Sequence, residues 1–235
     1  MRIVLLGPPG AGKGSLAWLC SERLGLAHLS TGEIFRQEMA RNSVLGQRVK
    51  RYVASGRLVP DALVVRVMSS RLGQGVLTKG FVLDGFPRTA GQAAGLDRTL
   101  TQRKQPLDGA LYLTSPEPLL IRRLSGRRVC GRCGANYHLR TMRPRRAGRC
   151  DRCQSALITR KDDQPATIKN RLAIDHRAAR PLLAYYRRHW LLYAVDGRGH
   201  IETVFVRAMK LFQRQRWLDD PPTCLQPAGP RPCSY

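Results

Sequence analysis

A glycine-rich turn near the amino terminus constrains the fold of this chain most strongly. The stretch from Gly7 to Ser15 reads Gly-Pro-Pro-Gly-Ala-Gly-Lys-Gly-Ser and follows the apolar run 3–6. Glycines allow positive φ angles and close approach of the backbone, so consecutive N–H groups can point at phosphate oxygens, and a following helix adds positive partial charge. A hydroxyl usually comes directly after the lysine, but here it comes one position later. The sequence therefore predicts a phosphate-binding loop made of Gly10, Ala11, Gly12, Lys13, Gly14 and Ser15.

Apolar runs alternate with helical patterns along the rest of the chain. Buried strands are expected at 2–6, 81–84 and 109–113, with a further apolar segment at 191–195. Helices are expected at about 15–24, 31–42, 61–72, 89–103, 116–126, 166–188 and 203–215. This alternation predicts an α/β fold, a doubly wound parallel sheet whose ligands bind at the carboxyl ends of the strands. Residues 219–235, with five prolines, are expected to be a disordered tail.

The charge and the apolar runs of this chain limit the classes of protein to which it can belong. The chain has 41 Lys and Arg against 16 Asp and Glu, a net charge of +25, and residues 122–161 alone carry 13 basic residues and one acidic residue. No apolar run approaches the ~20 residues of a membrane span, and Met1 leads directly into the first strand. A cytoplasmic protein without a membrane partner is therefore expected. A basic nucleic-acid-binding protein stays an alternative, although the basic segment has a single aromatic residue, Tyr137, for base stacking.

Four of the seven cysteines have the spacing of a metal site. Cys130 and Cys133 are separated by two residues, as are Cys150 and Cys153, and sixteen residues lie between the pairs. This spacing is typical of a four-thiolate zinc site, which is closed to substrate and therefore structural. Four unligated cysteines are the alternative. Flanking arginines that would offset the charge of such a site are Arg128, Arg132, Arg149 and Arg152. Cys20 is expected to be buried, and Cys224 and Cys233 to be free thiols.

Three further motifs follow the glycine-rich loop in order. They are Ser30-Thr31-Gly32-Glu33-Ile34-Phe35-Arg36, Gly56-Arg57-Leu58-Val59-Pro60-Asp61, and Asp84-Gly85-Phe86-Pro87-Arg88-Thr89 with Gln92. Together with the loop, they resemble bacterial adenylate kinases of the type with a long, zinc-binding lid, and the resemblance runs from Met1 to about Phe205. It implies reversible phosphoryl transfer, ATP + AMP ⇌ 2 ADP, with Mg²⁺ on the donor nucleotide and a structural Zn²⁺. A monomer without a specific nucleic-acid partner is expected.

The resemblance also implies a division of the chain. Residues 1–29, 61–126 and 164–218 would form the P-loop core, residues 30–60 a helical AMP-binding insertion, and residues 127–163 the zinc-binding lid. Two positions depart from the family pattern, since Glu33 replaces an Asp and Ser15 replaces a Thr. Both substitutions keep an oxygen at the position, so they bear on efficiency rather than on the type of reaction.

Roles follow from the resemblance for residues at matching positions. Asp84 is implied to hold the water ligands of Mg²⁺, and Gln92 to hydrogen-bond the adenine of AMP. The implied catalytic residues are Lys13, Asp84, Arg88, Arg123, Arg160 and Arg171. Besides the loop, the implied ATP-binding residues are Arg123, Arg127 and Tyr137. The implied AMP-binding residues are Thr31, Gly32, Arg36, Arg57, Val59, Val64, Gly85, Arg88, Gln92, Arg160 and Arg171.

Several alternatives accompany these roles. Tyr137 has a structural alternative, packing against the zinc loops. A kinase for another nucleoside monophosphate would share the loop and the Asp-Gly-Phe-Pro-Arg motif, but Gln92 and the cysteine-rich lid favour AMP as the acceptor. Surface positions are expected for His28, His176, His189 and His200.

Overall fold

The structure is a computed structural model that describes residues 1–54, 59–73, 79–159 and 163–218; the predicted tail at 219–235 lies outside them. The central strands are β1 (Arg2–Leu6), β2 (Ala27–Ser30), β3 (Phe81–Asp84), β4 (Gly109–Thr114) and β8 (Leu192–Asp196). The helices are α1 (Lys13–Leu24), α2 (Thr31–Ala40), α3 (Val44–Ala54), α4 (Asp61–Leu72), α5 (Ala90–Gln102), α6 (Glu117–Ser125), α7 (Pro165–Arg188) and α8 (Ile201–Arg214).

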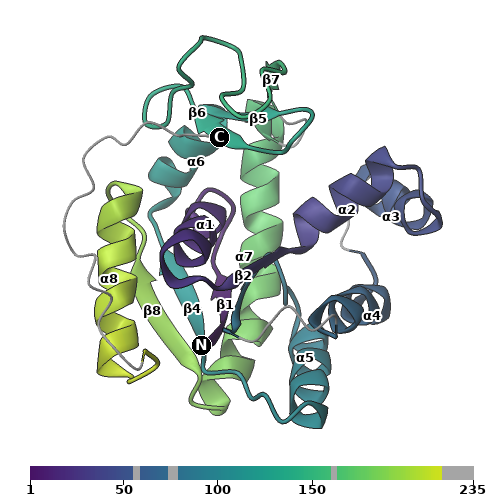
Figure 1. Ribbon diagram of the computed structural model, residues 1–235, viewed down its shortest axis with the longest axis vertical. Helices are drawn as coiled ribbons and strands as arrows, with labels where there is room; N and C mark the ends of the chain where they lie inside the picture. The colour runs from purple at the N-terminus through teal and green to yellow at the C-terminus, as the bar shows by residue number, and fades with distance from the viewer. Residues whose placement is uncertain (55–58, 74–78, 160–162, 219–235) are drawn as a thin grey trace.

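The central sheet is parallel throughout, in the order β2-β3-β1-β4-β8. Successive side chains of a strand point to opposite faces, so β1 feeds two cores. Ile3 and Leu5 pack with residues of α1 and α8, whereas Val4 and Leu6 pack with residues of α4, α5 and α7. Helices thus cover both faces (Figure 1), which confirms the doubly wound α/β fold expected from the sequence.

Two of the sequence motifs begin helices. The hydroxyl of Ser30 accepts a hydrogen bond from the Glu33 N–H at the start of α2, and the hydroxyl of Thr89 accepts one from the Gln92 N–H at the start of α5. Both are N-cap interactions that satisfy an otherwise unpaired backbone donor. The strand-to-helix turns that carry the motifs are therefore locally fixed.

A second, antiparallel sheet lies at one end of the molecule. It consists of β5 (Arg127–Cys130), β6 (Asn136–His138) and β7 (Leu157–Ile158), in the order β6-β5-β7. In Figure 1, α6 leads up to this sheet and α7 leads back from the same end, while α2 and α3 project sideways from the core. The strands β2 and β5 to β7 and the helix α3 were not predicted from the sequence. Among the described residues, no helix is long and apolar enough to cross a bilayer.

The register of the central sheet brings the glycine-rich loop and the motifs at 30–36 and 84–89 to one edge. Leu5 pairs with Asp84, and Ser30 pairs with Asp84 from the other side. Because the strands are parallel, the turn after β1, the end of β3 and the start of α2 lie together at the carboxyl edge. This edge is where the candidate site is built.

Candidate functional site

The glycine-rich turn joins β1 to α1 in a conformation that its glycines require. Gly7, Gly10 and Gly12 have φ angles of +133°, +83° and +99°. At Gly7 a side chain is also excluded by contact, because a Cβ atom there would lie 2.7 Å from the carbonyl oxygen of Leu113. The Ala11 N–H donates to the Pro8 carbonyl across the turn, at 3.1 Å. Such a turn at a helix N-terminus has the form of an anion-binding loop.

The side chain of Lys13 folds over this turn. Its Nζ donates hydrogen bonds to the carbonyl oxygens of Gly7 and Pro8, at 2.5 and 3.0 Å. Both acceptors are uncharged main-chain groups, so the ammonium keeps its full positive charge for a neighbouring anion. The loop thus carries a cation at its centre.

Lys13 faces several charged groups of the site. Burial lowers the pKa of its ammonium, and the carboxylates of Asp84 and Asp175 act in the opposite direction. The guanidinium groups of Arg88 and Arg171 lower that pKa further. Lys13 and the three predicted site residues Asp84, Arg88 and Arg171, which are distant in the sequence, therefore interact electrostatically. Asp175 of α7 joins them, although the sequence predicted no role for it.

Asp84 ends β3 beside the first turn of α1. A Cβ atom on Gly14 would lie 3.2 Å from its Oδ2, so glycine at position 14 leaves room for the carboxylate. His28 Nε2 lies 4.0 Å from the same oxygen, and the His28 side chain is 21% exposed. The expectation of a surface position for His28 is therefore wrong, because β2 carries this side chain to the edge beside Asp84.

The turn after β3 meets the start of α2. The buried hydroxyl of Thr31 donates to the carbonyl of Gly85 at 2.9 Å, and Nε of Arg88 donates to the same oxygen at 2.9 Å. Gly85 has a φ of +77°, and a Cβ there would lie 3.2 Å from Thr31 Oγ1. Gly32 stands close to Arg36, whose Nη1 lies 3.1 Å from the Cβ that Gly32 lacks. The structure thus brings these predicted acceptor-site residues together.

Gln92 is only 2% exposed, and its side-chain amide is held at both ends. Its Oε1 accepts from the Arg88 N–H at 2.8 Å, and its Nε2 donates to Asp61 Oδ1 at 2.9 Å. Asp61 Oδ2 in turn accepts from the Thr89 hydroxyl at 2.6 Å. A backbone N–H can only donate, so it fixes the orientation of the amide and leaves one N–H and one lone pair of Gln92 for further bonds. Asp61 ends the motif at 56–61, but the sequence predicted no role for this residue.

Val59 and Val64 lie near this network in the apolar core. Both side chains are buried, at 8% and 5% exposure, among residues of α2, α4 and α5. The remaining predicted residues Arg57 and Arg160 lie outside the described part of the chain.

Arg123 of α6 joins two loops at the carboxyl edge. Its guanidinium donates to the carbonyl of Gly10 at 3.4 Å and to those of Gly197 and Gly199 at 2.9 and 3.0 Å. Burial lowers its pKa, with a further contribution from Arg122. The phosphate loop and the turn after β8 are thereby held by one cation.

Two predicted arginines share a buried carboxylate. Arg127 of β5 donates through Nε to Asp163 Oδ2 at 2.6 Å and through Nη2 to Oδ1, which is a bidentate ion pair. Arg171 of α7 donates to the same Oδ1 at 3.1 Å. Asp163 is 1% exposed, and its partners compensate the cost of burying a charge. The sequence offered one signal for this residue, a pair of aspartates directly after a segment almost without acidic residues.

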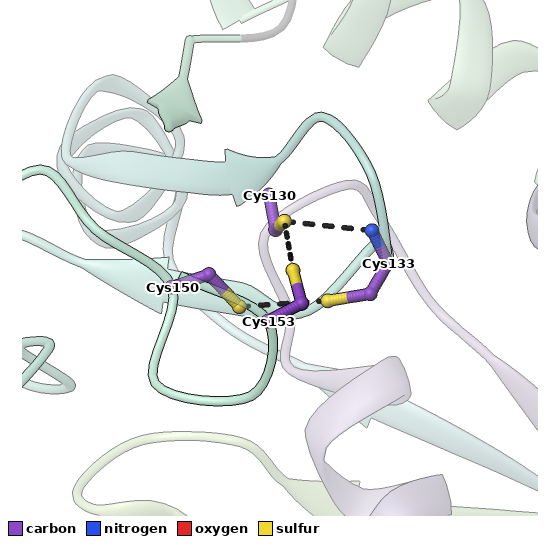
Figure 2. Close-up of side chains that lie close together, drawn as sticks. All are labelled: Cys130, Cys133, Cys150 and Cys153. Carbon is purple, nitrogen blue, oxygen red and sulfur yellow. Dashed lines mark hydrogen bonds between the residues drawn. The ribbon is translucent and has the colours of Figure 1, made fainter. Parts of the chain in front are cut away.

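The four cysteines of the second sheet converge from two turns. Their sulfur atoms all lie within 4.8 Å of one another, and the pairs Cys130–Cys153 and Cys133–Cys150 are 3.3 and 3.5 Å apart (Figure 2). A tetrahedral Zn²⁺ with bonds of about 2.3 Å separates its sulfur ligands by about 3.8 Å. Hydrogen bonds from Ser155 lower the pKa of Cys153 to about 6. The cluster is therefore compatible with zinc in geometry and in donor chemistry.

Tyr137 packs against this cluster. It is buried with Cys130 and Cys150, and its hydroxyl lies 3.5 Å from Cys150 Sγ and accepts the Asp151 N–H at 2.7 Å. Desolvation raises its pKa to about 12. These contacts match the structural alternative for Tyr137, while the contact with ATP stays a prediction. Cys20 is buried as expected, and burial raises its pKa to about 12.

Comparison with known proteins gives the family. A model of the adenylate kinase family matches residues 5–190. Adenylate kinase of Clostridium tetani (strain Massachusetts / E88) is 44% identical over 205 residues, which cover 87% of this chain and 95% of that protein. Adenylate kinase of Clostridium botulinum (strain 657 / Type Ba4) is 43% identical over 216 residues, which cover 92% of this chain and all of that protein. The match spans the phosphate loop, the acceptor motifs and the cysteine cluster, and this chain therefore belongs to the adenylate kinase family of ATP:AMP phosphotransferases.

Proposed function

We propose that the carboxyl edge of the central sheet is where this chain carries out the family reaction. A phosphate oxygen of AMP attacks the γ-phosphorus of ATP, the bond from that phosphorus to the β–γ bridging oxygen breaks, and two ADP result. Such a transfer needs positioning and cations around the moving charge rather than covalent chemistry by the protein. The observation that carries this proposal is the shared environment of Lys13, Asp84, Arg88 and Arg171.

The donor side is proposed to be the loop 10–15 with the arginines that surround it. Main-chain N–H groups of the loop and the ammonium of Lys13 would bind the phosphates of ATP. Asp84, which has room beside Gly14, would hold Mg²⁺ through its water ligands. When bound with ATP, Mg²⁺ neutralises charge on the transferred phosphoryl group. Arg123, Arg127 and Tyr137 complete the proposed donor set.

The acceptor side is proposed to lie between α2 and the turn after β3. Arg36, Arg88 and Arg171 would bind the phosphate of AMP, with Arg57 and Arg160 in parts of the chain not described. The free N–H and lone pair of Gln92 would pair with the adenine edge, and Asp61 keeps the amide in place for this. A base with a different polar edge would leave buried groups unpaired, so the geometry favours adenine. Thr31, Gly32, Val59, Val64 and Gly85 complete this proposed set.

The cysteine cluster is proposed to hold one structural Zn²⁺. Its four sulfurs would fill a tetrahedral shell and leave no position for substrate. Residues 127–163 would act as a lid and residues 30–60 as the acceptor insertion, both closing over the core 1–29, 61–126 and 164–218 to exclude water. A monomeric, cytoplasmic enzyme is the proposed working form.

A coupled assay tests the acceptor assignment. ATP and Mg²⁺ are offered with AMP, CMP, UMP or GMP in turn, and kcat/KM is compared. We expect AMP to exceed each of the others by about 10³-fold or more, since unpaired buried polar groups oppose the wrong base. Comparable turnover with CMP or UMP would contradict the assigned acceptor site.

A further inference from the structure

His138 lies at the junction between the second sheet and the rest of the molecule. It ends β6 and stands opposite Arg127 of β5. Its ring packs on Gly126, the residue after α6, so closely that a Cβ atom on Gly126 would lie 2.4 Å from His138 Nε2. Gly126 has an ordinary helical φ of −85°, so this contact, and not the backbone conformation, requires glycine there. The His138 ring therefore packs directly against the residue that joins α6 to β5.

The other ring nitrogen organises the turn that follows β6. His138 Nδ1 accepts the N–H groups of Arg140 and Thr141, at 3.1 and 3.2 Å. The next residue, Leu139, donates its N–H to the Gly126 carbonyl at 2.9 Å. Two donors at one nitrogen require an unprotonated Nδ1, so the ring must be neutral to make these bonds. A single side chain thus connects the turn 139–142 to the end of α6.

The surroundings also favour the neutral ring. Burial lowers the pKa of His138, and the cationic groups of Arg123, Arg140 and Arg128 lower it further. Only the backbone carbonyl of Arg122 acts in the opposite direction. Among the described residues, Nε2 is buried and has no well-aligned hydrogen-bond partner. The three arginines lie on α6, on β5 and in the turn after β6, so a cation from each of these elements disfavours a charged ring.

We propose that neutral His138 is a positioning residue that fixes the second sheet on the end of α6 and thereby sets Arg127 for ATP binding. Arg127 follows Gly126 directly and pairs in register with His138, and its guanidinium is already held by Asp163. Protonation removes the Nδ1 acceptor and places a fourth cation among three arginines. The inference rests on the donor role proposed above for Arg127.

The sign of the pH effect follows from the lowered pKa. Between the unfolded value of about 6.5 and the lower folded value, the unfolded state binds more protons, so the stabilisation by His138 is present above that range and is lost as pH falls through it. KM for ATP should therefore rise on the acid side by more than KM for AMP, because Arg127 belongs to the proposed donor set and reaches the acceptor residue Arg171 only through Asp163. Loss of one neutral hydrogen bond corresponds to about a 5-fold increase in the KM for ATP.

The experiment compares the wild type with His138→Asn, His138→Ala and the control His176→Asn, whose histidine is exposed on α7. KM for each nucleotide and kcat are measured from about pH 5.5 to about pH 8, a range in which histidine titrates. Asn places an oxygen where Nδ1 stands and cannot titrate. We expect it to keep a near-normal KM for ATP at neutral pH and to lose the acid rise, whereas Ala raises that KM by about 5-fold across the range.

Thermal unfolding over the same range provides a readout without catalysis. The melting difference between wild type and His138→Ala should shrink as pH falls, and His176→Asn should follow the wild type throughout. An acid rise in the KM for ATP that persists in His138→Asn, or an Ala variant with wild-type values, would overturn the proposal. A wild-type protein that melts as expected but does not convert ATP and AMP would instead contradict the proposed function.

Discussion

At the scale of single residues, the site depends on cations whose main partners are uncharged. Lys13 donates to two main-chain carbonyls and Arg123 to four, and among the described residues neither donates a hydrogen bond to a carboxylate. Carbonyl partners fix the position of a cation and leave its charge available to phosphates. Arg127 and Arg171 differ, since both share Asp163. The two groups of cations should therefore respond differently to substitution.

Substitution of Lys13 or Arg88 tests the catalytic assignment. We expect Lys13→Met and Arg88→Ala each to lower kcat by about 10²-fold or more, because each cation faces charge that is redistributed during transfer. Steady-state kinetics with circular dichroism separates this loss from unfolding. Arg98→Ala, an exposed position on α5, is the matched control and should leave kcat unchanged. Near-normal turnover of either site variant would refute the assignment.

Asp61 provides a second test at this scale. Asp61→Ala removes the acceptor for Gln92 Nε2 and for the Thr89 hydroxyl, so the amide that is proposed to pair with adenine loses one of its two anchors. We expect KM for AMP to rise by about 10-fold, with KM for ATP and kcat little changed. Asp97→Ala, which removes the partner of the Tyr185 hydroxyl on the same core face, serves as control. An equal rise for both nucleotides would contradict a positioning role confined to the acceptor site.

Asp61 also shows which residues the sequence could reveal. Lys13 and the four cysteines were found because their spacing is local and typical of one chemistry. Asp61 acts on a residue 31 positions away, and Asp163 on Arg127, 36 positions away. Their partners are set by how helices and strands pack, which a single sequence does not encode as a local pattern. His28 was misplaced for the same reason, since its strand was not predicted.

At the scale of elements, strands and helices with a strong apolar pattern were predicted, and those with a weak pattern were missed. The bounds of β1, β3 and α4 agree with the expected ranges, because continuous apolar runs and a proline-started helix are distinct signals. The strand β2 has only four residues, Ala27–Ser30, all half-buried, so its sequence shows no apolar run. The second sheet has strands of two to four residues, and its order comes from the cysteine turns rather than from apolar patterning.

Metal analysis tests this second sheet. We expect one zinc per chain, and we expect Cys153→Ser to lower the melting temperature while most turnover at low temperature is retained. The physical reason is that a segment with a core this small would fold around a bound ion, whereas the proposed catalytic residues Lys13, Asp84 and Arg88 lie at the carboxyl edge of the central sheet. Cys20→Ser, at a buried cysteine outside the cluster, controls for loss of a thiol. Metal-free protein from careful purification, or chemistry that stops in a still-folded variant, would contradict a structural zinc.

At the scale of the whole molecule, residues 122–161, with 13 basic residues and one acidic residue, carry about half of the net charge of +25. Five of the arginines there are exposed, and their guanidinium groups make no hydrogen bond or ion pair with any described residue: Arg132, Arg140, Arg145, Arg146 and Arg152. A parallel sheet with helices on both faces was predicted from the alternation of patterns, but the order of its strands, β2-β3-β1-β4-β8, was not. The sequence also predicted no partner for this surplus charge.

A salt titration tests what the charge does. We expect fluorescent RNA and DNA oligonucleotides to bind at about 50 mM salt without sequence preference. They should lose most of their affinity by about 200 mM salt, because such binding is driven by the release of counterions. Replacing the five arginines by Gln should flatten the salt dependence more than replacing Arg177, Arg180, Arg187, Arg188 and Arg214, five exposed arginines of α7 and α8. Tight, sequence-selective binding at physiological salt, or equal effects of both variants, would contradict this expectation.

The convergence of the four sulfurs has a consequence for oxidation. Cys130 and Cys153 lie 3.3 Å apart, and Cys153 is a thiolate near neutral pH, so the metal-free form holds a nucleophile beside a second thiol. With peroxide as oxidant, such a pair loses two electrons and two protons and closes a disulfide. A zinc ion bound at the four sulfurs, as proposed above, would therefore also protect them from oxidation, and its loss under oxidative stress would allow a covalent change in the second sheet.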